Sequence, residues 1–250
     1  MVKIVLTPDW FIGNDVLIEA FSLIVLALIA IIAIKNYKKN QSNRNLLYLS
    51  LGFTLLAIAQ LASVLTKIVL YYDFGPSQAI GYAIVTSNLL SSVDIFYHTG
   101  FSLFKFLTLL GFYIIYRLPR DKKSVMDYVI LFYFIMLSVI IEENFYFIFH
   151  ITALMILIAI VEKYYLVYKK NGFINTKILI IAFSILAFSQ LIFILSSLDV
   201  FFAAANIAEL ISYSILLGLG IRLMKNGEKK KPYGNYIRHA GNNPRKKRKH

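Results

Sequence analysis

The sequence predicts an all-α integral membrane protein with seven transmembrane helices. Of its 250 residues, 59% are hydrophobic and 16% charged, whereas a soluble domain is closer to half apolar and a quarter charged. The apolar residues gather in runs close to the ~20 residues that cross ~30 Å of hydrocarbon. Lipid offers the backbone no hydrogen-bonding partner, so runs this long and continuous are expected to form helices.

Residues 1–13 are expected to be an extracellular segment with Trp10 at headgroup level. The first apolar run is interpreted as a retained helix, because a signal peptide has an apolar core of only about 7–15 residues after a basic start. The predicted spans are 14–34, 46–72, 97–118, 125–141, 145–167, 174–198 and 200–223.

Two connections need separate treatment. A single helix over 125–165 would be about 60 Å long, so Glu142, Glu143 and Asn144 are expected to form a tight turn between two spans. Segment 73–97 is the one long outer connection. Its stretch 79–90 is too short to span and is predicted to form a surface helix or lid over the outer mouth. An irregular loop, or an early start of the third span, is the alternative.

Basic residues predict the orientation. Four Lys or Arg lie in 35–44, four in 117–123, four in 163–177 and eleven from Arg222 onward, and these segments are alternate loops on one side of the membrane. By the positive-inside rule the N-terminus is outside and the C-terminus cytoplasmic. The sequence therefore predicts a multi-pass protein of the cell membrane, with a transmembrane domain over 14–224.

Three matches in the same order indicate an internal duplication. Tyr-Lys-Lys-Asn occurs at 37–40 and 168–171, FTLLAIAQL at 53–61 matches FSILAFSQL at 183–191, and 91–118 matches 196–223. The prediction is two three-helix repeats, 14–118 and 145–224, joined by a linking helix at 125–141. Both repeats start outside, so they are parallel.

This 3+1+3 plan resembles the microbial rhodopsins and the SWEET and PQ-loop transporters at the level of architecture. The rhodopsin family implies a retinal-binding lysine in the seventh span, where this chain has no interior lysine. The PQ-loop family implies Pro-Gln pairs, whereas Gln60 and Gln190 follow Ala59 and Ser189. Neither family's function is carried over.

Lys105 and Glu209 are charged residues inside predicted spans. Burying a charge in the membrane is unfavourable, and such residues are usually paired with a partner. Both lie some 12–15 Å from the outer ends of their helices, which predicts an ion pair between the third and seventh spans. Such a pair either fixes helix register or guards a ligand or proton site.

Gln60 and Gln190 lie near mid-span in equivalent helices, and an amide in hydrocarbon must be hydrogen-bonded. They either join helices or flank a central ligand site as a pseudo-symmetric pair, and Asn206 and Thr108 would extend either arrangement.

No metal, cofactor or enzymatic activity is expected. Cysteine is absent, which excludes disulfides and thiolate chemistry. His98 and His150 lack metal-ligand spacing and are assigned, with nearby carboxylates, to an acidic rim at the membrane surface. Glu19 is assigned to stabilising the first helix dipole, and no catalytic motif is found.

The segment 225–250 is predicted to be a disordered, basic cytoplasmic tail. Its clustered cations are expected to bind anionic lipid headgroups, and a cytoplasmic protein or nucleic acid is the alternative partner. The clustered residues are Lys229, Lys230, Lys231, Arg245, Lys246, Lys247, Arg248 and Lys249.

The sequence favours a receptor- or sensor-like protein with a ligand site in the outer half of the bundle, between the third and seventh helices. A small-solute transporter built from the repeat is the first alternative. A membrane scaffold or partner subunit without a ligand is the second.

Overall fold

The computed structural model describes residues 7–39, 41, 44–71, 82–117, 125–140, 146–195 and 199–229, with the side chains of α3 described from Tyr97 onward. Within this part of the chain all regular structure is helical. A short 3-10 helix, η1 (Asp9–Phe11), precedes seven α-helices. They are α1 (Asn14–Lys39), α2 (Arg44–Tyr71), α3 (Tyr82–Arg117), α4 (Val125–Ile140), α5 (Tyr146–Asn171), α6 (Ile174–Ile194) and α7 (Asp199–Lys229).

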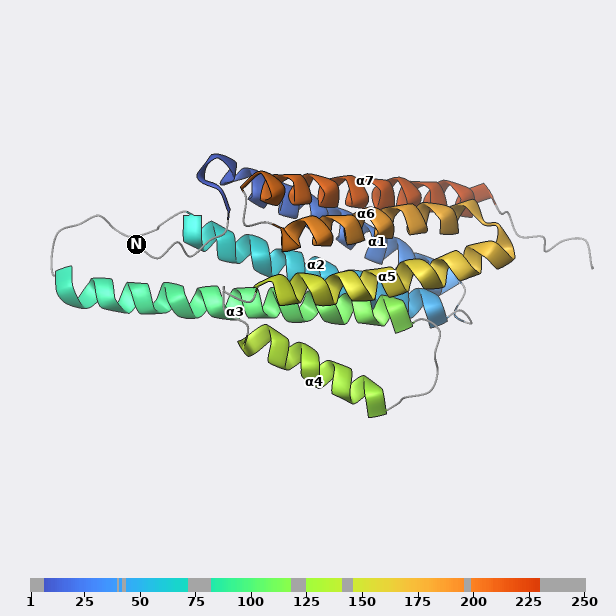
Figure 1. Ribbon diagram of the computed structural model, residues 1–250. Helices are drawn as coiled ribbons and strands as arrows, with labels where there is room; N and C mark the ends of the chain where they lie inside the picture. The colour runs from blue at the N-terminus through green and yellow to red at the C-terminus, as the bar shows by residue number, and fades with distance from the viewer. Residues whose placement is uncertain are drawn as a thin grey trace, which may run out of the picture.

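Six of the helices form a closed ring (Figure 1). Going round it, α1 packs on α2, α2 on α3, α3 on α5, α5 on α6, α6 on α7, and α7 on α1 again. Helices α1, α5 and α7 begin at one end of the ring, which we call the N-terminal end, and α2 and α6 finish there. In this ring α3 and α7 occupy opposite positions.

The same six helices are long and apolar enough to cross a bilayer, which makes the chain a multi-pass membrane protein. The prediction of seven spans is confirmed for these six and not for α4. Helix α4 has 16 residues and is therefore about 24 Å long, less than the ~30 Å of the hydrocarbon core. It lies outside the ring against α3 and carries the chain back towards the start of α5 (Figure 1).

The prediction that a separate lid helix precedes the third span is wrong for the described residues. Helix α3 runs without a break for 36 residues, about 54 Å, and its first turns project beyond the N-terminal end of the ring (Figure 1). Residues 82–96 contain neither glycine nor proline, so nothing interrupts the helix. The alternative of an early start to the third helix is confirmed, and residues 72–81 lie outside the described chain.

Glycines bring α2 and α3 together. A Cβ on Gly111 would lie 3.0 Å from the carbonyl oxygen of Gly52, and a Cβ on Gly52 would lie 2.6 Å from Cγ1 of Ile115. Near the N-terminal end, a Cβ on Gly100 would lie 1.9 Å from Oγ1 of Thr66. Small residues permit such close backbone approach between membrane helices, and these contacts fix the register of α2 against α3.

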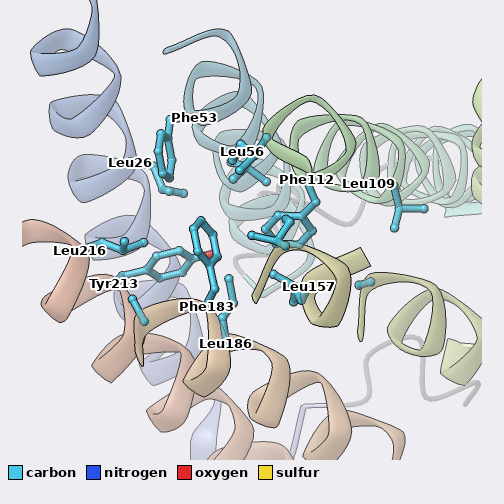
Figure 2. Packing of buried hydrophobic residues seen from close by; sticks show 14 of the residues in the cluster. Leu26, Phe53, Leu56, Leu109, Phe112, Leu157, Phe183, Leu186, Tyr213 and Leu216 are labelled. Atoms are coloured by element: carbon cyan, nitrogen blue, oxygen red, sulfur yellow. The ribbon is translucent and has the colours of Figure 1, made fainter. Parts of the chain in front are cut away.

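One large apolar side chain from each ring helix meets the others in the middle of the bundle (Figure 2). Each exposes no more than 2% of its surface. We call this set the apolar layer: Leu26, Phe53, Phe112, Leu157, Phe183 and Leu216. These side chains are packed closely, as in a protein interior.

The segment before α1 folds back over the start of α7. Phe11 is 6% exposed and packs edge-on against Phe202, which in turn contacts Phe193 of α6. Trp10 beside it is 62% exposed, in keeping with the headgroup position expected from the sequence. Gly13 turns the chain into α1 with φ +88°, a value that favours glycine.

Candidate polar site in the helix ring

A layer of polar residues lies on the N-terminal side of the apolar layer. In each ring helix a polar or charged residue stands seven positions from the apolar-layer residue, in the direction of the N-terminal end. Seven residues are two helical turns, so the two side chains share a face about 10 Å apart. We call the set the polar layer: Glu19, Gln60, Lys105, His150, Gln190 and Glu209.

An ion cluster joins α1 and α2 at the edge of the polar layer. The Nζ of Lys67 lies 2.7 Å from Oδ2 of Asp15 and 2.7 Å from Oε1 of Glu19. The side chain of Asp15 is fully buried, and those of Lys67 and Glu19 are 6% and 14% exposed. One ammonium group therefore faces two carboxylates, which leaves this cluster with an excess of negative charge.

Both carboxylates also accept hydrogen bonds from neighbouring hydroxyl groups. Oδ2 of Asp15 also accepts a bond from the Tyr71 hydroxyl at 2.7 Å and one from the Thr7 hydroxyl at 3.1 Å. Oε2 of Glu19 accepts a bond from Ser63 at 2.9 Å. A buried ion pair is stable only when its remaining lone pairs are satisfied in this way, so the cluster holds α1 and α2 in one arrangement.

Gln60 connects the two halves of the ring. Its Nε2 donates a hydrogen bond to Oε1 of Glu209 on α7 at 3.3 Å, and the Tyr213 hydroxyl also interacts with Glu209. An ionised carboxylate only accepts hydrogen bonds, so the amide must turn its NH₂ towards Glu209. Oε1 of Gln60 is consequently left buried without a hydrogen-bond partner among the described residues.

His150 and Gln190 form a second polar pair between α5 and α6, with Nδ1 of the histidine 2.7 Å from Oε1 of the glutamine. Ser189 donates its hydroxyl proton to the carbonyl of Leu186 and can accept from Nε2 of Gln190 at 3.5 Å. This arrangement places the amide oxygen towards His150, so that Nδ1 carries the proton. Nε2 of His150 is then a buried acceptor without a partner in the described chain.

Helix α5 contributes Tyr146 to the site, next to His150. Tyr146, one turn before His150, interacts electrostatically with Lys67, Glu19 and Glu209. Its ring lies 4.2 Å from that of His150, centroid to centroid, and the ring of Phe193 stacks on the histidine at 4.8 Å. The arrangement is a buried centre with several acceptors, chemically suited to bind a donor or a proton.

The structure does not bring Lys105 and Glu209 together as predicted. Within the described chain the ion pairs are those of Lys67 and one between Arg117 and Asp127. Glu209 contacts Gln60 instead, and Lys105 acts electrostatically on His150. The predicted Lys105–Glu209 ion pair is therefore not formed, because ring closure places α3 and α7 on opposite sides.

The other predicted site residues differ in their contacts. Thr108 lies one turn from Lys105 and is buried, with no hydrogen-bond partner for its hydroxyl among the described residues. Asn206 donates a hydrogen bond to the carbonyl of Phe202 in its own helix at 2.9 Å, so it does not extend the polar layer through that bond. Gln60 and Gln190 hydrogen-bond to different partners, Glu209 and His150.

The predicted acidic rim and the role of Glu19 also need correction. His98 is exposed, but His150 is only 4% exposed and belongs to the interior. Glu142, Glu143 and the side chain of Asp94 lie outside the described part of the chain. Glu19 is a member of the ion cluster, and among described residues no group of three His, Cys, Asp or Glu could hold a metal ion.

Sequence reasoning missed the polar contacts of Asp15, Lys67, Tyr71 and Tyr213. A signal was present: Lys67 stands seven residues from Gln60 on α2, and Asp15 and Glu19 are four apart on α1, so each set shares a helix face. The tail residues from Lys230 onward and the side chain of Lys229 lie outside the described chain, and the lipid-binding prediction stays a prediction.

Comparison of the chain with protein-family models, curated proteins and solved structures finds no match in any of the three.

Proposed function

We propose that this chain is a receptor- or sensor-like protein of the cell membrane and that its polar layer is the ligand site. The observation that carries the proposal is the buried, unpaired Oε1 of Gln60 beside Glu209. A buried polar atom without a partner is unfavourable by about 1–3 kcal/mol. A bound ligand or water that supplies the missing partner removes that penalty.

The apolar layer favours binding without passage. It fills the ring about 10 Å beyond the polar layer with side chains that are at most 2% exposed. A solute that reached the polar layer could not pass the closely packed apolar side chains without a rearrangement of the helices. A sensor needs no such passage, because ligand binding only has to change the contacts among helices. The Gln60–Glu209 bond between α2 and α7 is the contact that ligand binding alters first.

In the proposed topology the N-terminus is outside and the C-terminus cytoplasmic, as the distribution of basic residues indicates. Helix α4, although short, links two parallel three-helix repeats. The repeat is supported by the two layers, because the offset that aligns Tyr37 with Tyr168 also pairs Glu19 with His150 and Leu26 with Leu157. The offset that aligns the glutamines likewise pairs Phe53 with Phe183.

A small-solute transporter is the second candidate, and the division of the ring favours it. Helices α1, α2 and α3 pack extensively on each other, as do α5, α6 and α7, while α3–α5 and α1–α7 join the two groups less extensively. Two units of this kind can rock about a site between them. The Gln60–Glu209 bond crosses this boundary.

The basic tail is proposed to hold the cytoplasmic face near anionic lipid headgroups or to bind a cytoplasmic protein or nucleic acid. A scaffold without a ligand remains the third candidate, in which the polar layer only joins helices.

The experiment that separates the candidates measures binding and flux with the same probes. Thermal unfolding of the purified protein in detergent is followed against ethylammonium, glycine, glucose and acetate, and saturable stabilisation identifies binding. The probe that binds is then used, radiolabelled, in proteoliposomes. Binding without flux above that of protein-free liposomes supports the sensor, and flux supports the transporter. No saturable binding by any probe contradicts both and leaves the scaffold.

A further inference from the structure

We infer that the ligand of the polar layer is a small primary ammonium ion, bound beside Gln60 and Glu209. The inference rests on the proposed function and adds the chemical class of the ligand. It follows from the kind of hydrogen-bonding group that the layer leaves unpaired and from the sign of the charge beside it.

The unpaired atoms are acceptors. Oε1 of Gln60 is an acceptor because the NH₂ of that amide is directed at Glu209, and Nε2 of His150 is an acceptor because Nδ1 carries the ring proton. Both side chains are at least nine-tenths buried, at 5% and 4% exposure. A ligand that satisfies them must donate hydrogen bonds.

The side chain next to Gln60 is an acid in the bundle interior. Glu209 forms no ion pair in the described chain, and its nearest polar neighbours are Gln60 and Tyr213. Glu19 and Lys67 both act on it electrostatically, but the ammonium group of Lys67 lies against Glu19 and Asp15 and is not bonded to Glu209. An ionised Glu209 is an interior carboxylate without a bonded cation, which is unfavourable, so a ligand that binds the ionised form must carry a positive charge.

Charge and donors are needed on the same small group. A primary ammonium group has three N–H donors, enough for Oε1 of Gln60 and the Glu209 carboxylate together. A quaternary ammonium ion carries the charge but no donor, and an anion would face Glu209 and Glu19. Lys105 acts electrostatically on His150, which disfavours a second positive charge at that end of the layer and points to a monocation.

The test compares probes that differ in one property. Ethylammonium, tetramethylammonium and acetate, all at constant ionic strength, are titrated against the wild-type protein in detergent, with thermal stability and calorimetry as readouts. We expect saturable binding of ethylammonium only. Loss of a charge-assisted hydrogen bond corresponds to a decrease in affinity on the order of tenfold or more, which we expect for Glu209→Gln and Gln60→Leu. Glu162→Gln, an exposed carboxylate of α5, is the matched control and should bind as wild type does.

The wild-type comparison remains decisive even if a variant fails to fold. Equal binding of tetramethylammonium, or binding of ethylammonium that Glu209→Gln leaves unchanged, would overturn the inference. Saturable binding of acetate, glycine or glucose in place of ethylammonium overturns the ligand class but leaves the proposed ligand site standing. If no probe of any class binds, the inference and the proposed function fail together.

Discussion

Replacing Lys67 with methionine should be among the most destabilising single changes in this protein. The substitution keeps a long side chain but removes the ammonium group that lies 2.7 Å from both Asp15 and Glu19. Two carboxylates, 0% and 14% exposed, then remain without their cation. Removing one partner of a buried pair typically destabilises by about 3–5 kcal/mol, and we expect a loss of that size for Lys67→Met.

The assay is equilibrium unfolding in detergent micelles. The matched control is Lys177→Met in α6, an exposed lysine whose replacement should change the free energy of unfolding by no more than about 0.5 kcal/mol. A triple variant that adds Asp15→Asn and Glu19→Gln should recover most of the loss, because neutral groups no longer need the ammonium. If Lys67→Met lies within about 1 kcal/mol of wild type, the cluster is not the buried ion pair described above.

Two further predictions test the helix contacts. Gly111→Ala should destabilise by about 1–3 kcal/mol through overpacking, since the new Cβ would lie 3.0 Å from a backbone oxygen of α2, whereas Gly218→Ala has nothing within 4 Å and should be neutral or slightly stabilising. Equal effects of the two in the unfolding assay would refute the close α2–α3 approach. In double-mutant cycles, Gln60→Ala and Glu209→Ala should be coupled by at least 0.5 kcal/mol, while Lys105→Ala and Glu209→Ala should add to within about 0.5 kcal/mol. Coupling in the second cycle alone would restore the predicted Lys105–Glu209 pair.

Much of the helical architecture could be predicted from the sequence. Six of the predicted spans correspond to helices long and apolar enough to cross a membrane, because the hydrocarbon thickness imposes a length that is visible in one dimension. The fourth was also predicted as a span; the described α4 has 16 residues, fewer than a span needs, and lies outside the ring. The start of α3 was predicted as a lid because residues 79–90 alone are too short to span, although nothing in residues 82–96 breaks a helix.

The sequence predicted which polar residues lie inside the bundle better than it predicted which of them contact each other. Gln60, Gln190, Lys105 and Glu209 were predicted as interior polar groups, and all four belong to the polar layer. The partner assigned to Glu209 was wrong, because similar depth in two helices says nothing about whether those helices are neighbours. Lys67 was not recognised as a partner of the two carboxylates Asp15 and Glu19.

The sequence by itself determined that this chain is a bundle of membrane helices with polar groups inside some of them. The need to bury backbone hydrogen bonds within helices and the cost of placing charge in hydrocarbon act on each residue separately. Their effects are therefore visible in the sequence as long apolar runs and as rare polar residues within them. Only the tertiary structure decided which helices are neighbours, since ring closure sets α7 beside α1 and opposite α3. It thereby decided that Glu209 meets Gln60 and that one lysine serves two carboxylates. Contacts between residues far apart in the chain depend on how helices pack in three dimensions, and spacing along one helix does not record them.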